Sequence, residues 1–335
     1  MPNAKMRTGP IERAAVIYGA GDLRVEAREK EVLQPGHAVI SLRSVGICGS
    51  DLGYFRGTST YPVTSAFVLG HEAMGVVAAV DDSAPGRKAS ALTVGTRVAL
   101  IPGSSCGHCE LCLTGLDNLC RKVRYLGSAS TDPPVDGALR TSMSLPIERL
   151  VPLPDQVSDA SAALLEPLAV AEHAVRRADV AGRSVLITGG GAIGQLLALT
   201  ARAAGASKVT VCELVQRRRQ LALDHGADQA VEPKDIEQAI AKAPIFDVAL
   251  DATGNQAAVD LGIRAVKPGT GRVVIVGNLP QGSGIPIGAI ARSEIWVTAT
   301  FRFPEGLSRA LELVLAGLEI DWIVERVVDL DHLDA

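Results

Sequence analysis

The chain has 335 residues and a formal net charge of -4, with acidic and basic side chains spread along its length. It is long enough for two domains, and it has no basic tract of the kind that binds nucleic acid. It also lacks an apolar run of about 18 residues for a membrane span, and residues 1–12 lack the apolar segment of a secretory signal. We therefore expect a loose N-terminal tail, with neither nucleic acid nor membrane as a partner.

Short strands separated by turns are predicted from about Arg13 to Leu153. A hairpin is expected from two strands at 14–18 and 23–26 with the turn 19–22 between them. Further strands are predicted at 38–43, 75–80 and 97–100, with a polar loop around Pro85–Arg87. Strands at this spacing, without helices between them, are typical of a small β-barrel.

Strands and helices alternate after Pro154. A helix is expected to begin near Ser158 and to run towards Asp179. The later predicted strands are 184–188, 208–212, 246–250, 272–276 and 295–300, with helices at 192–204 and 215–225. This alternation predicts an α/β domain with a doubly wound parallel sheet.

A glycine-rich loop joins the strand 184–188 to the helix that follows it. The sequence Gly-Gly-Gly-Ala-Ile-Gly at 189–194 fits the pattern G-x-G-x-x-G. Its glycines allow a tight turn, a close approach of pyrophosphate to the backbone, and close packing of helix and strand. A loop that merely tightens an ordinary βα turn is the alternative. The predicted dinucleotide contacts in this loop are Gly189, Gly191, Ala192, Ile193 and Gly194.

Glu213 ends the next strand, nineteen residues after Gly194. A carboxylate at this place accepts hydrogen bonds from the adenosine ribose and repels a 2′-phosphate, which favours NAD over NADP. Three consecutive arginines at 217–219 complicate this preference, because one could pair with a 2′-phosphate, although a solvated helix face is the simpler interpretation. The other predicted cofactor contacts are Arg218, Thr253, Val276 and Gly277.

Four cysteines lie close together in the pattern C-x2-C-x2-C-x7-C: Cys106, Cys109, Cys112 and Cys120. Four thiolates in one loop complete a tetrahedral zinc site with no open position, which predicts a structural zinc that helps this loop to fold. Two local disulfides or free thiols are the alternative, and His108 is expected to be an exposed spacer. The spacing suits metal binding better than a disulfide framework, so a cytoplasmic location is the default expectation.

A thiolate, an imidazole and a carboxylate are supplied by Cys48 and the pair His71-Glu72. Zinc accepts this ligand mixture, and three protein ligands with one open position make a catalytic site. A lone buried cysteine or histidine would be an ordinary core residue. Together with a dinucleotide motif, however, these residues predict hydride transfer from an alcohol, since zinc lowers the pKa of a hydroxyl group.

These motifs together resemble the zinc-dependent medium-chain dehydrogenase/reductase family, the alcohol and polyol dehydrogenases. The resemblance covers nearly the whole chain and is carried by residues 46–51, 70–72, 166–170 and 189–194 together with the cysteine loop. It implies a GroES-like β-barrel catalytic domain, a Rossmann NAD-binding domain and two zinc ions per chain. It also implies that Cys48 and His71 hold the catalytic zinc with Glu72 and Glu166 nearby. In the polyol branch a carboxylate at the Glu166 position reaches zinc directly or through water; a solvated helix-end carboxylate is the alternative.

The resemblance further implies roles for Ser50, Tyr54 and Arg302. Ser50 would take the proton of the substrate hydroxyl, but Gly53 stands where the family often has a relay histidine, so the route to solvent is incomplete. Tyr54 resembles a pocket tyrosine, and Arg302 could pair with a substrate carboxylate or hydrogen-bond zinc-bound water and substrate hydroxyls. We expect a secondary alcohol of a sugar acid as substrate. The alternatives are a neutral polyol or, more remotely, a non-catalytic NAD-binding protein.

The expected catalytic domain spans residues 13–154 and is completed by 304–335, with the nucleotide-binding domain at 155–303. The resemblance leads us to expect another helix and strand beyond Ala335, as if the C-terminus were truncated. An exposed last strand at 295–300 could pair with its copy in a second subunit, which predicts a homodimer or homotetramer.

Overall fold

The computed structural model describes residues 11–81 and 92–333, so the predictions for residues 1–10 and for the loop around Pro85–Arg87 lie outside the described residues. The chain divides into two compact units, Met1–Glu166 with Val324–Ala335 and Pro167–Ile323. The sequence had placed the boundaries earlier, at 154/155 and 303/304. The helix α3 (Asp159–Ala163) accounts for the first difference, because it packs against strands of the first unit.

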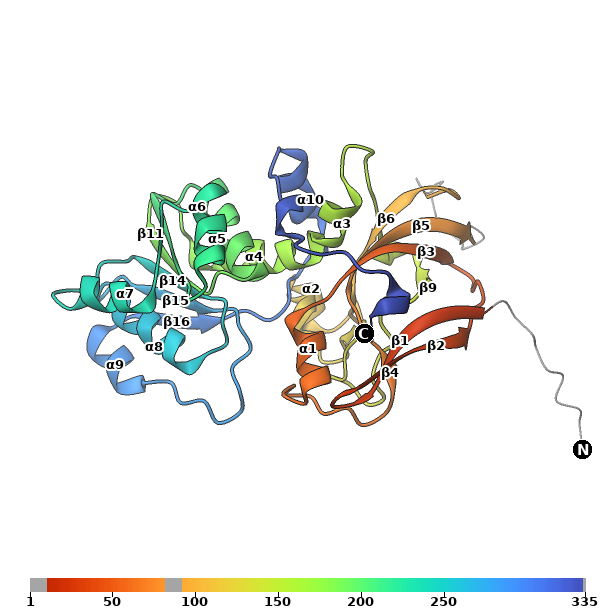
Figure 1. Cartoon of the computed structure of the whole chain (residues 1–335), viewed down its shortest axis with the longest axis horizontal. Helices are drawn as coiled ribbons and strands as arrows, with labels where there is room; N and C mark the ends of the chain where they lie inside the picture. Colours follow the sequence, from red (N-terminus) through yellow and green to blue (C-terminus); the bar gives the residue numbers. More distant parts are fainter. Residues whose placement is uncertain (1–10, 82–91, 334–335) are drawn as a thin grey trace, which may run out of the picture. The chain divides into compact units, whose positions relative to one another are not determined.

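The first unit contains a three-stranded antiparallel sheet with the order β2-β1-β4 (Figure 1). The strands β1 (Ile11–Gly19) and β2 (Asp22–Glu29) form the predicted hairpin, and β4 (Phe67–Val68) pairs with the other edge of β1. The tail prediction is wrong for its last two residues, which belong to β1. Glu12 is buried there because its carboxylate accepts hydrogen bonds from Arg140 and Ser142.

A five-stranded antiparallel sheet forms the rest of the barrel-like core, in the order β10-β6-β5-β3-β9. It comprises β3 (His37–Gly46), β5 (Glu72–Val80), β6 (Arg97–Leu100), β9 (Ser142–Pro146) and β10 (Leu150–Pro152). The first three confirm predicted strands, whereas the short β9 and β10 were not predicted. The register of β3 against β5 ends at the pair Gly46 and Glu72, which places the residues beyond these ends side by side.

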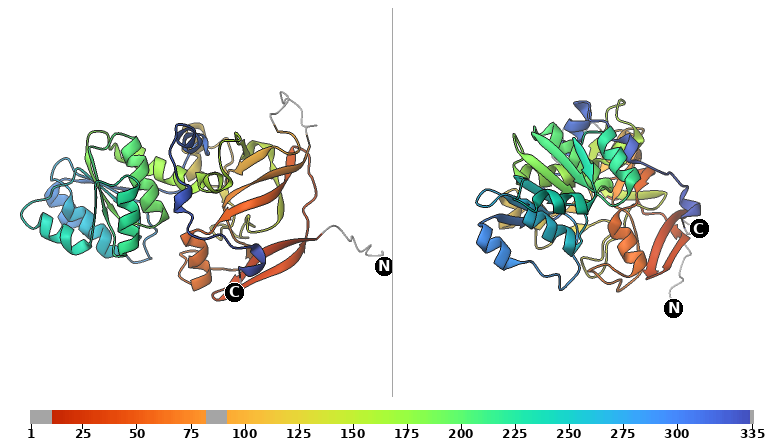
Figure 2. Two further views of the ribbon diagram at one scale, coloured as in Figure 1. Left: turned by 45° about the horizontal axis from the view of Figure 1, so that its top comes forward. Right: turned by 60° about the vertical axis from the view of Figure 1, so that its left-hand side comes forward.

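The second unit contains a six-stranded sheet in which every strand pair is parallel, in the order β13-β12-β11-β14-β15-β16. Helices cover both faces of this sheet (Figure 2), which confirms the doubly wound fold. The strands are β11 (Ser184–Thr188), β12 (Lys208–Cys212), β13 (Gln229–Val231), β14 (Val248–Asp251), β15 (Arg272–Ile275) and β16 (Trp296–Ala299). The helices are α5 (Ala192–Ala203), α6 (Gln216–Asp224), α7 (Pro233–Ile240), α8 (Gln256–Ala265), α9 (Ile287–Ser293) and α10 (Ser308–Leu315).

The helix predicted from Ser158 towards Asp179 is two helices, α3 and α4 (Leu165–Ala178). Ser158 caps α3 by accepting a hydrogen bond from the Ser161 N–H. Pro167 explains the break, since proline has no N–H to donate and its ring clashes with the carbonyl four residues earlier. The restart places Glu166 in the first turn of α4.

After α10 and a short 3-10 turn (Asp321–Ile323), the chain returns to the first unit. Leu330 and Leu333 pack against the cluster formed by β1 and β4, and Asp331 pairs with Arg13 at 3.0 Å. The returning segment is therefore 324–333 among the described residues. Across residues 11–81 and 92–333, none of the helices combines the length and apolar character needed to cross a membrane.

Candidate metal and nucleotide sites

The ends of β3 and β5 bring three potential zinc ligands together in the first unit. The Sγ atom of Cys48, a ring nitrogen of His71 and a carboxylate oxygen of Glu72 all lie within 4.8 Å of one another. This set of one sulfur, one nitrogen and one oxygen donor fits zinc. Glycine at position 46 leaves room for the Glu72 carboxylate, because an added Cβ would lie 2.1 Å from the Glu72 Oε2 atom and would displace it.

Asp51 ties the two ligand-bearing segments to each other. It lies in the first turn of α1 (Gly49–Arg56), and its carboxylate accepts hydrogen bonds from the N–H of Cys48 at 2.9 Å and of Gly70 at 3.2 Å. Asp51 is 2% exposed, and burial raises the pKa of its carboxyl group. Sequence reasoning missed this residue, although a capping carboxylate three positions after Cys48 was a local signal for it.

Acidic groups crowd this cluster. Burial raises the pKa of Glu72 well above its usual value, and the charges of Cys48 and Glu166 raise it further. Burial also raises the pKa of the Cys48 thiol, while hydrogen bonds from Ser50 to the sulfur oppose this rise. A bound divalent cation would offset this repulsion and favour the anionic forms of both ligands. The residues therefore fit a zinc ion by donor type, spacing and charge.

Glu166 lies beside the three-residue group and is 5% exposed. Its Oε1 atom accepts a hydrogen bond of 2.6 Å from the hydroxyl group of Tyr125, for which the sequence alone predicted no role at the site. The two residues are 41 positions apart, and no local pattern signals their contact. Direct ligation of zinc by Glu166 stays a prediction.

The four cysteines form a second compact group, with their sulfur atoms within 4.8 Å of one another. The loop that carries them lies between two paired strands, β7 (Gly103–Ser104) and β8 (Arg124–Tyr125). All four are free rather than disulfide-bonded, and a hydrogen bond from the backbone N–H of His108 lowers the pKa of Cys106 to about 6. The His108 ring is exposed and contacts the Cys106 carbonyl at 2.7 Å. Four sulfur donors in this arrangement fit a closed zinc site.

The glycine-rich loop lies between β11 and the start of α5, as the sequence predicted. Gly189 has a φ of 95°, and an added Cβ at Gly194 would lie 1.9 Å from the Gly189 carbonyl oxygen. An added Cβ at Gly191, by contrast, would meet no atom within 4 Å. Glycine at 191 thus leaves open space at the helix N-terminus, which fits a pyrophosphate group.

Glu213 lies next to this loop. Its Oε2 atom accepts a hydrogen bond of 2.6 Å from the Gly190 N–H, and its Oε1 atom accepts one of 2.8 Å from Val215. Arg219 hydrogen-bonds the backbone of Glu213 and pairs with Glu232 at 3.0 Å, so its guanidinium is committed within the domain. Arg218 is exposed on α6.

Asp251 hydrogen-bonds the predicted cofactor-binding residues that follow strands β14 and β15. Its carboxylate accepts hydrogen bonds from Thr188, from the Thr253 hydroxyl at 2.6 Å, and from the Gly254 N–H at 3.0 Å. Its carbonyl accepts from the N–H groups of Val276 and Gly277. Thr253, Val276 and Gly277 therefore lie, like the glycine-rich loop, at the carboxyl-terminal ends of the parallel strands. Sequence reasoning missed Asp251, although a carboxylate ending an apolar strand was its signal.

Two predicted substrate-side residues lie in different units. Tyr54 is 3% exposed, and its hydroxyl oxygen accepts a hydrogen bond of 2.9 Å from the Ala129 N–H, while its ring meets Phe67 edge-on. Arg302 belongs to the second unit, has a φ of 55°, and places its guanidinium 4.6 Å from the centre of the Phe301 ring.

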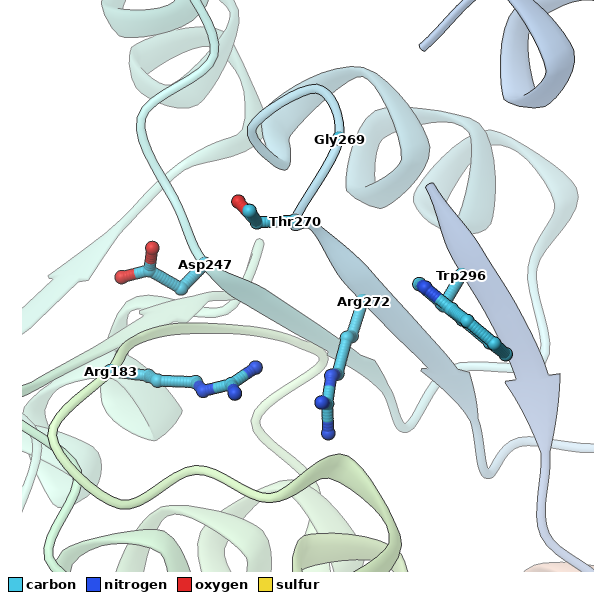
Figure 3. Close-up of a pocket in the computed structure, with 6 residues that line it drawn as sticks. All are labelled: Arg183, Asp247, Gly269, Thr270, Arg272 and Trp296. Atoms are coloured by element: carbon cyan, nitrogen blue, oxygen red, sulfur yellow. The ribbon is translucent and has the colours of Figure 1, made fainter. Parts of the chain in front are cut away.

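A cavity of about 290 Å³ lies at the amino-terminal ends of the parallel strands, at the end of the sheet opposite the glycine-rich loop (Figure 3). Its lining residues precede or begin strands β11, β14, β15 and β16: Arg183, Asp247, Gly269, Thr270, Arg272 and Trp296. Both arginines contact Asp179, at 3.1 and 3.2 Å. Dinucleotides bind at the carboxyl ends of parallel strands, so this cavity is not the nucleotide site.

Known proteins resemble the chain over almost its full length. Residues 34–155 match the family model described as alcohol dehydrogenase GroES-like domain, and residues 192–316 match the model described as zinc-binding dehydrogenase. L-idonate 5-dehydrogenase of Vitis vinifera is 32% identical, covering 92% of this chain and 85% of that protein. Sorbitol dehydrogenase of Bacillus subtilis is 33% identical, covering 96% and 88%. The structure of a Sinorhizobium meliloti protein, assigned to the zinc-binding dehydrogenases and bound to NADP, is 31% identical with a TM-score of 0.86, covering 97% and 94%.

Proposed function

Because the chain belongs to the zinc-dependent medium-chain dehydrogenase/reductase family, we propose that it oxidises a secondary alcohol of a sugar acid, of the L-idonate type, with NAD. At the coarser level it is an oxidoreductase of the alcohol and polyol dehydrogenase type that uses zinc and a nicotinamide dinucleotide. The observation that carries the proposal is the compact group of Cys48, His71 and Glu72. A non-catalytic NAD-binding protein would have no need to keep this ligand set together.

When bound, zinc supplies a Lewis acid that lowers the pKa of the substrate hydroxyl, and the nicotinamide supplies the hydride acceptor. Cys48, His71 and Glu72 would hold the metal. The Ser50 hydroxyl would accept the substrate proton and pass it to the nicotinamide ribose. Gly53 offers no imidazole for the next transfer, so a different group must release the proton to solvent. Overall the alcohol loses a hydride and a proton, which gives a ketone, NADH and a free proton.

The preference for NAD rests on Glu213 and Arg219. Both carboxylate oxygens of Glu213 already accept one backbone hydrogen bond, and each keeps a second lone pair for a ribose hydroxyl. A 2′-phosphate would meet this negative charge, and the nearby Arg219 is committed to Glu232. We therefore expect a higher kcat/KM with NAD than with NADP.

A panel of aldonates and polyols, assayed for NADH and NADPH formation, tests the proposed function. L-idonate should give the highest kcat/KM, and conversion to 5-keto-gluconate should be seen by chromatography. Sorbitol or xylitol as the best substrate would instead favour the neutral-polyol alternative, which the Bacillus subtilis relative supports. If zinc-containing protein oxidised none of the alcohols in the panel, this result would contradict the proposed reaction.

Arg302→Ala separates a sugar acid from a neutral polyol as the substrate class. A hydrogen bond to a charged group contributes about 1.5–3 kcal/mol, so kcat/KM for L-idonate should fall about 10- to 100-fold. The value for sorbitol should change much less, because sorbitol has no carboxylate. Arg292→Ala, at an exposed arginine of the same unit, is the matched control. Equal losses for both substrates would contradict a carboxylate anchor at Arg302.

We also propose a homodimer or homotetramer in the cytoplasm. β16 is the last strand of its sheet, and Trp296 at its start is 73% exposed, which leaves a strand edge for a second copy. Trp296→Glu should shift the sedimentation mass towards the monomer, whereas Val327→Glu, at another exposed apolar residue, should not. A wild-type monomer at micromolar concentration would contradict the proposed assembly. Cell fractionation tests the proposed cytoplasmic location.

A further inference from the structure

We propose that Tyr125 is a positioning residue of the catalytic centre, whose hydroxyl group holds the Glu166 carboxylate in place beside the Cys48, His71 and Glu72 group. The proposal rests on the proposed function to the extent that this group binds a metal ion. It adds a link between the two candidate zinc sites, because Tyr125 belongs to the strand pair that closes the cysteine loop.

The hydrogen bond between Tyr125 and Glu166 is short and buried. The Tyr125 hydroxyl donates to Glu166 Oε1 at 2.6 Å, and the two residues are 7% and 5% exposed. That length is typical of an O–H group donating to an ionised carboxylate. The Tyr125 ring also meets the His71 imidazole edge-on, with 5.8 Å between ring centres. One side chain therefore contacts both a predicted metal ligand and the neighbouring carboxylate.

The place of Glu166 matters because its charge acts on the metal-binding group. The Glu166 carboxylate interacts electrostatically with both Cys48 and Glu72. A carboxylate that swung towards the cluster would add negative charge to a bound cation and could occupy its open position. By engaging one carboxylate oxygen, the Tyr125 hydroxyl restricts this rotation. Tyr125 thus helps to set the ligand number and the charge around the metal.

Tyr125 is itself held by the base of the cysteine loop. It pairs with Gly103 across β7 and β8, and an added Cβ at Gly103 would lie 3.5 Å from the Tyr125 ring. The neighbouring Leu126 N–H donates to the Pro102 carbonyl at 3.0 Å. Arg149 donates to the carbonyls of Ile101 at 3.0 Å and Pro102 at 2.6 Å. The loop from Cys106 to Cys120 lies between these two strands, so its closure supports the tyrosine.

A purely structural role for Tyr125 makes a different prediction. If the ring only fills space, Tyr125→Phe should be nearly silent, because phenylalanine keeps the ring and its contact with His71. If loss of the hydroxyl group disturbed the whole unit, Tyr125→Phe should lower kcat/KM whether or not Glu166 is present. A role through Glu166 requires that the effect of Tyr125→Phe depend on that carboxylate.

A double-mutant cycle with Tyr125→Phe and Glu166→Ala, made in the full-length protein, tests the proposal. The first readout is the visible absorption spectrum after cobalt replaces zinc at the catalytic group, with zinc kept in the cysteine loop. The second is kcat/KM with the best substrate of the panel. Tyr125→Phe should shift the cobalt bands and lower kcat/KM about tenfold or more, since a hydrogen bond to a charged group is lost. In the Glu166→Ala background it should shift no band and change kcat/KM less than about twofold.

Tyr18→Phe is the matched control, because the Tyr18 hydroxyl also donates to a carboxylate, that of Glu26 at 2.9 Å, on the protein surface. It should leave both readouts unchanged. An unchanged cobalt spectrum and kcat/KM in Tyr125→Phe would overturn the proposal, as would equal effects in both backgrounds. The cobalt spectrum is recorded without substrate, so it tests the role of Tyr125 even if the substrate proposed above is wrong. A wild-type protein that bound no cobalt at Cys48 and His71 would contradict the proposed function and this proposal together.

Discussion

The His71→Ala variant is expected to lose at least about a thousandfold in kcat/KM while it still binds NADH with wild-type affinity. His71 is 7% exposed and supplies the only nitrogen donor in the group with Cys48 and Glu72. Metal polarisation of a substrate oxygen contributes several kcal/mol, and about 4 kcal/mol corresponds to a thousandfold in rate. The dinucleotide loop belongs to the other unit, which explains why its affinity should be kept.

Turnover, NADH titration and zinc content per chain together check this expectation. His37→Ala is the control, because His37 begins β3 in the same unit and directs its Nδ1 atom at the Pro35 carbonyl. It should keep its zinc and its activity. Wild-type turnover in His71→Ala, or an unchanged zinc content, would show that the catalytic metal is held elsewhere.

Gly194→Ala is expected to weaken NADH binding by about a hundredfold or more and to destabilise the second unit. The added Cβ would lie 1.9 Å from the carbonyl oxygen of Gly189 and 2.8 Å from its carbonyl carbon. These are backbone atoms, so the clash is relieved only if the turn opens and helix α5 moves away from β11. Overpacking of this kind costs about 1–3 kcal/mol in stability. Titration of NADH fluorescence and thermal unfolding measure the two effects.

Two matched glycine variants isolate the cause. Gly284→Ala should change neither stability nor binding, because its Cβ would meet no atom within 4 Å. Gly191→Ala also has room in the protein, so it should keep the melting temperature yet weaken NADH binding, since the new methyl group would occupy the space for pyrophosphate. If Gly194→Ala bound NADH normally, the assignment of the dinucleotide to this loop would be wrong.

The parallel sheet was predictable where its signals are local. Strands 184–188 and 208–212 are apolar runs ending at a glycine loop or a carboxylate, and both match β11 and β12 residue for residue. Other elements lack such signals. β9 contains serines and ends in proline, and it is a strand because it pairs with β3, about a hundred residues away in sequence. Glu12 was expected in a loose tail because nothing nearby indicated its pairing with Arg140.

The candidate site shows the same division between local and distant information. The residue types and spacings predicted Cys48, His71, Glu72 and the four cysteines, and the structure brings both sets together. The geometry of the Cys48, His71 and Glu72 group depends on the register of β3 against β5, which no sequence motif specifies. The contact of Tyr125 with Glu166 depends on where the cysteine loop closes, and so it could not be predicted from either residue alone.

Crystal diffraction recorded on both sides of the zinc absorption edge tests the central claim most directly. The account predicts two anomalous peaks per chain. One should be bounded by Cys48, His71 and Glu72, and the other by the four sulfur atoms of the cysteine loop. A peak in the cysteine loop with none beside Cys48, in protein that turns over its alcohol substrate, would contradict a zinc-dependent reaction at this site.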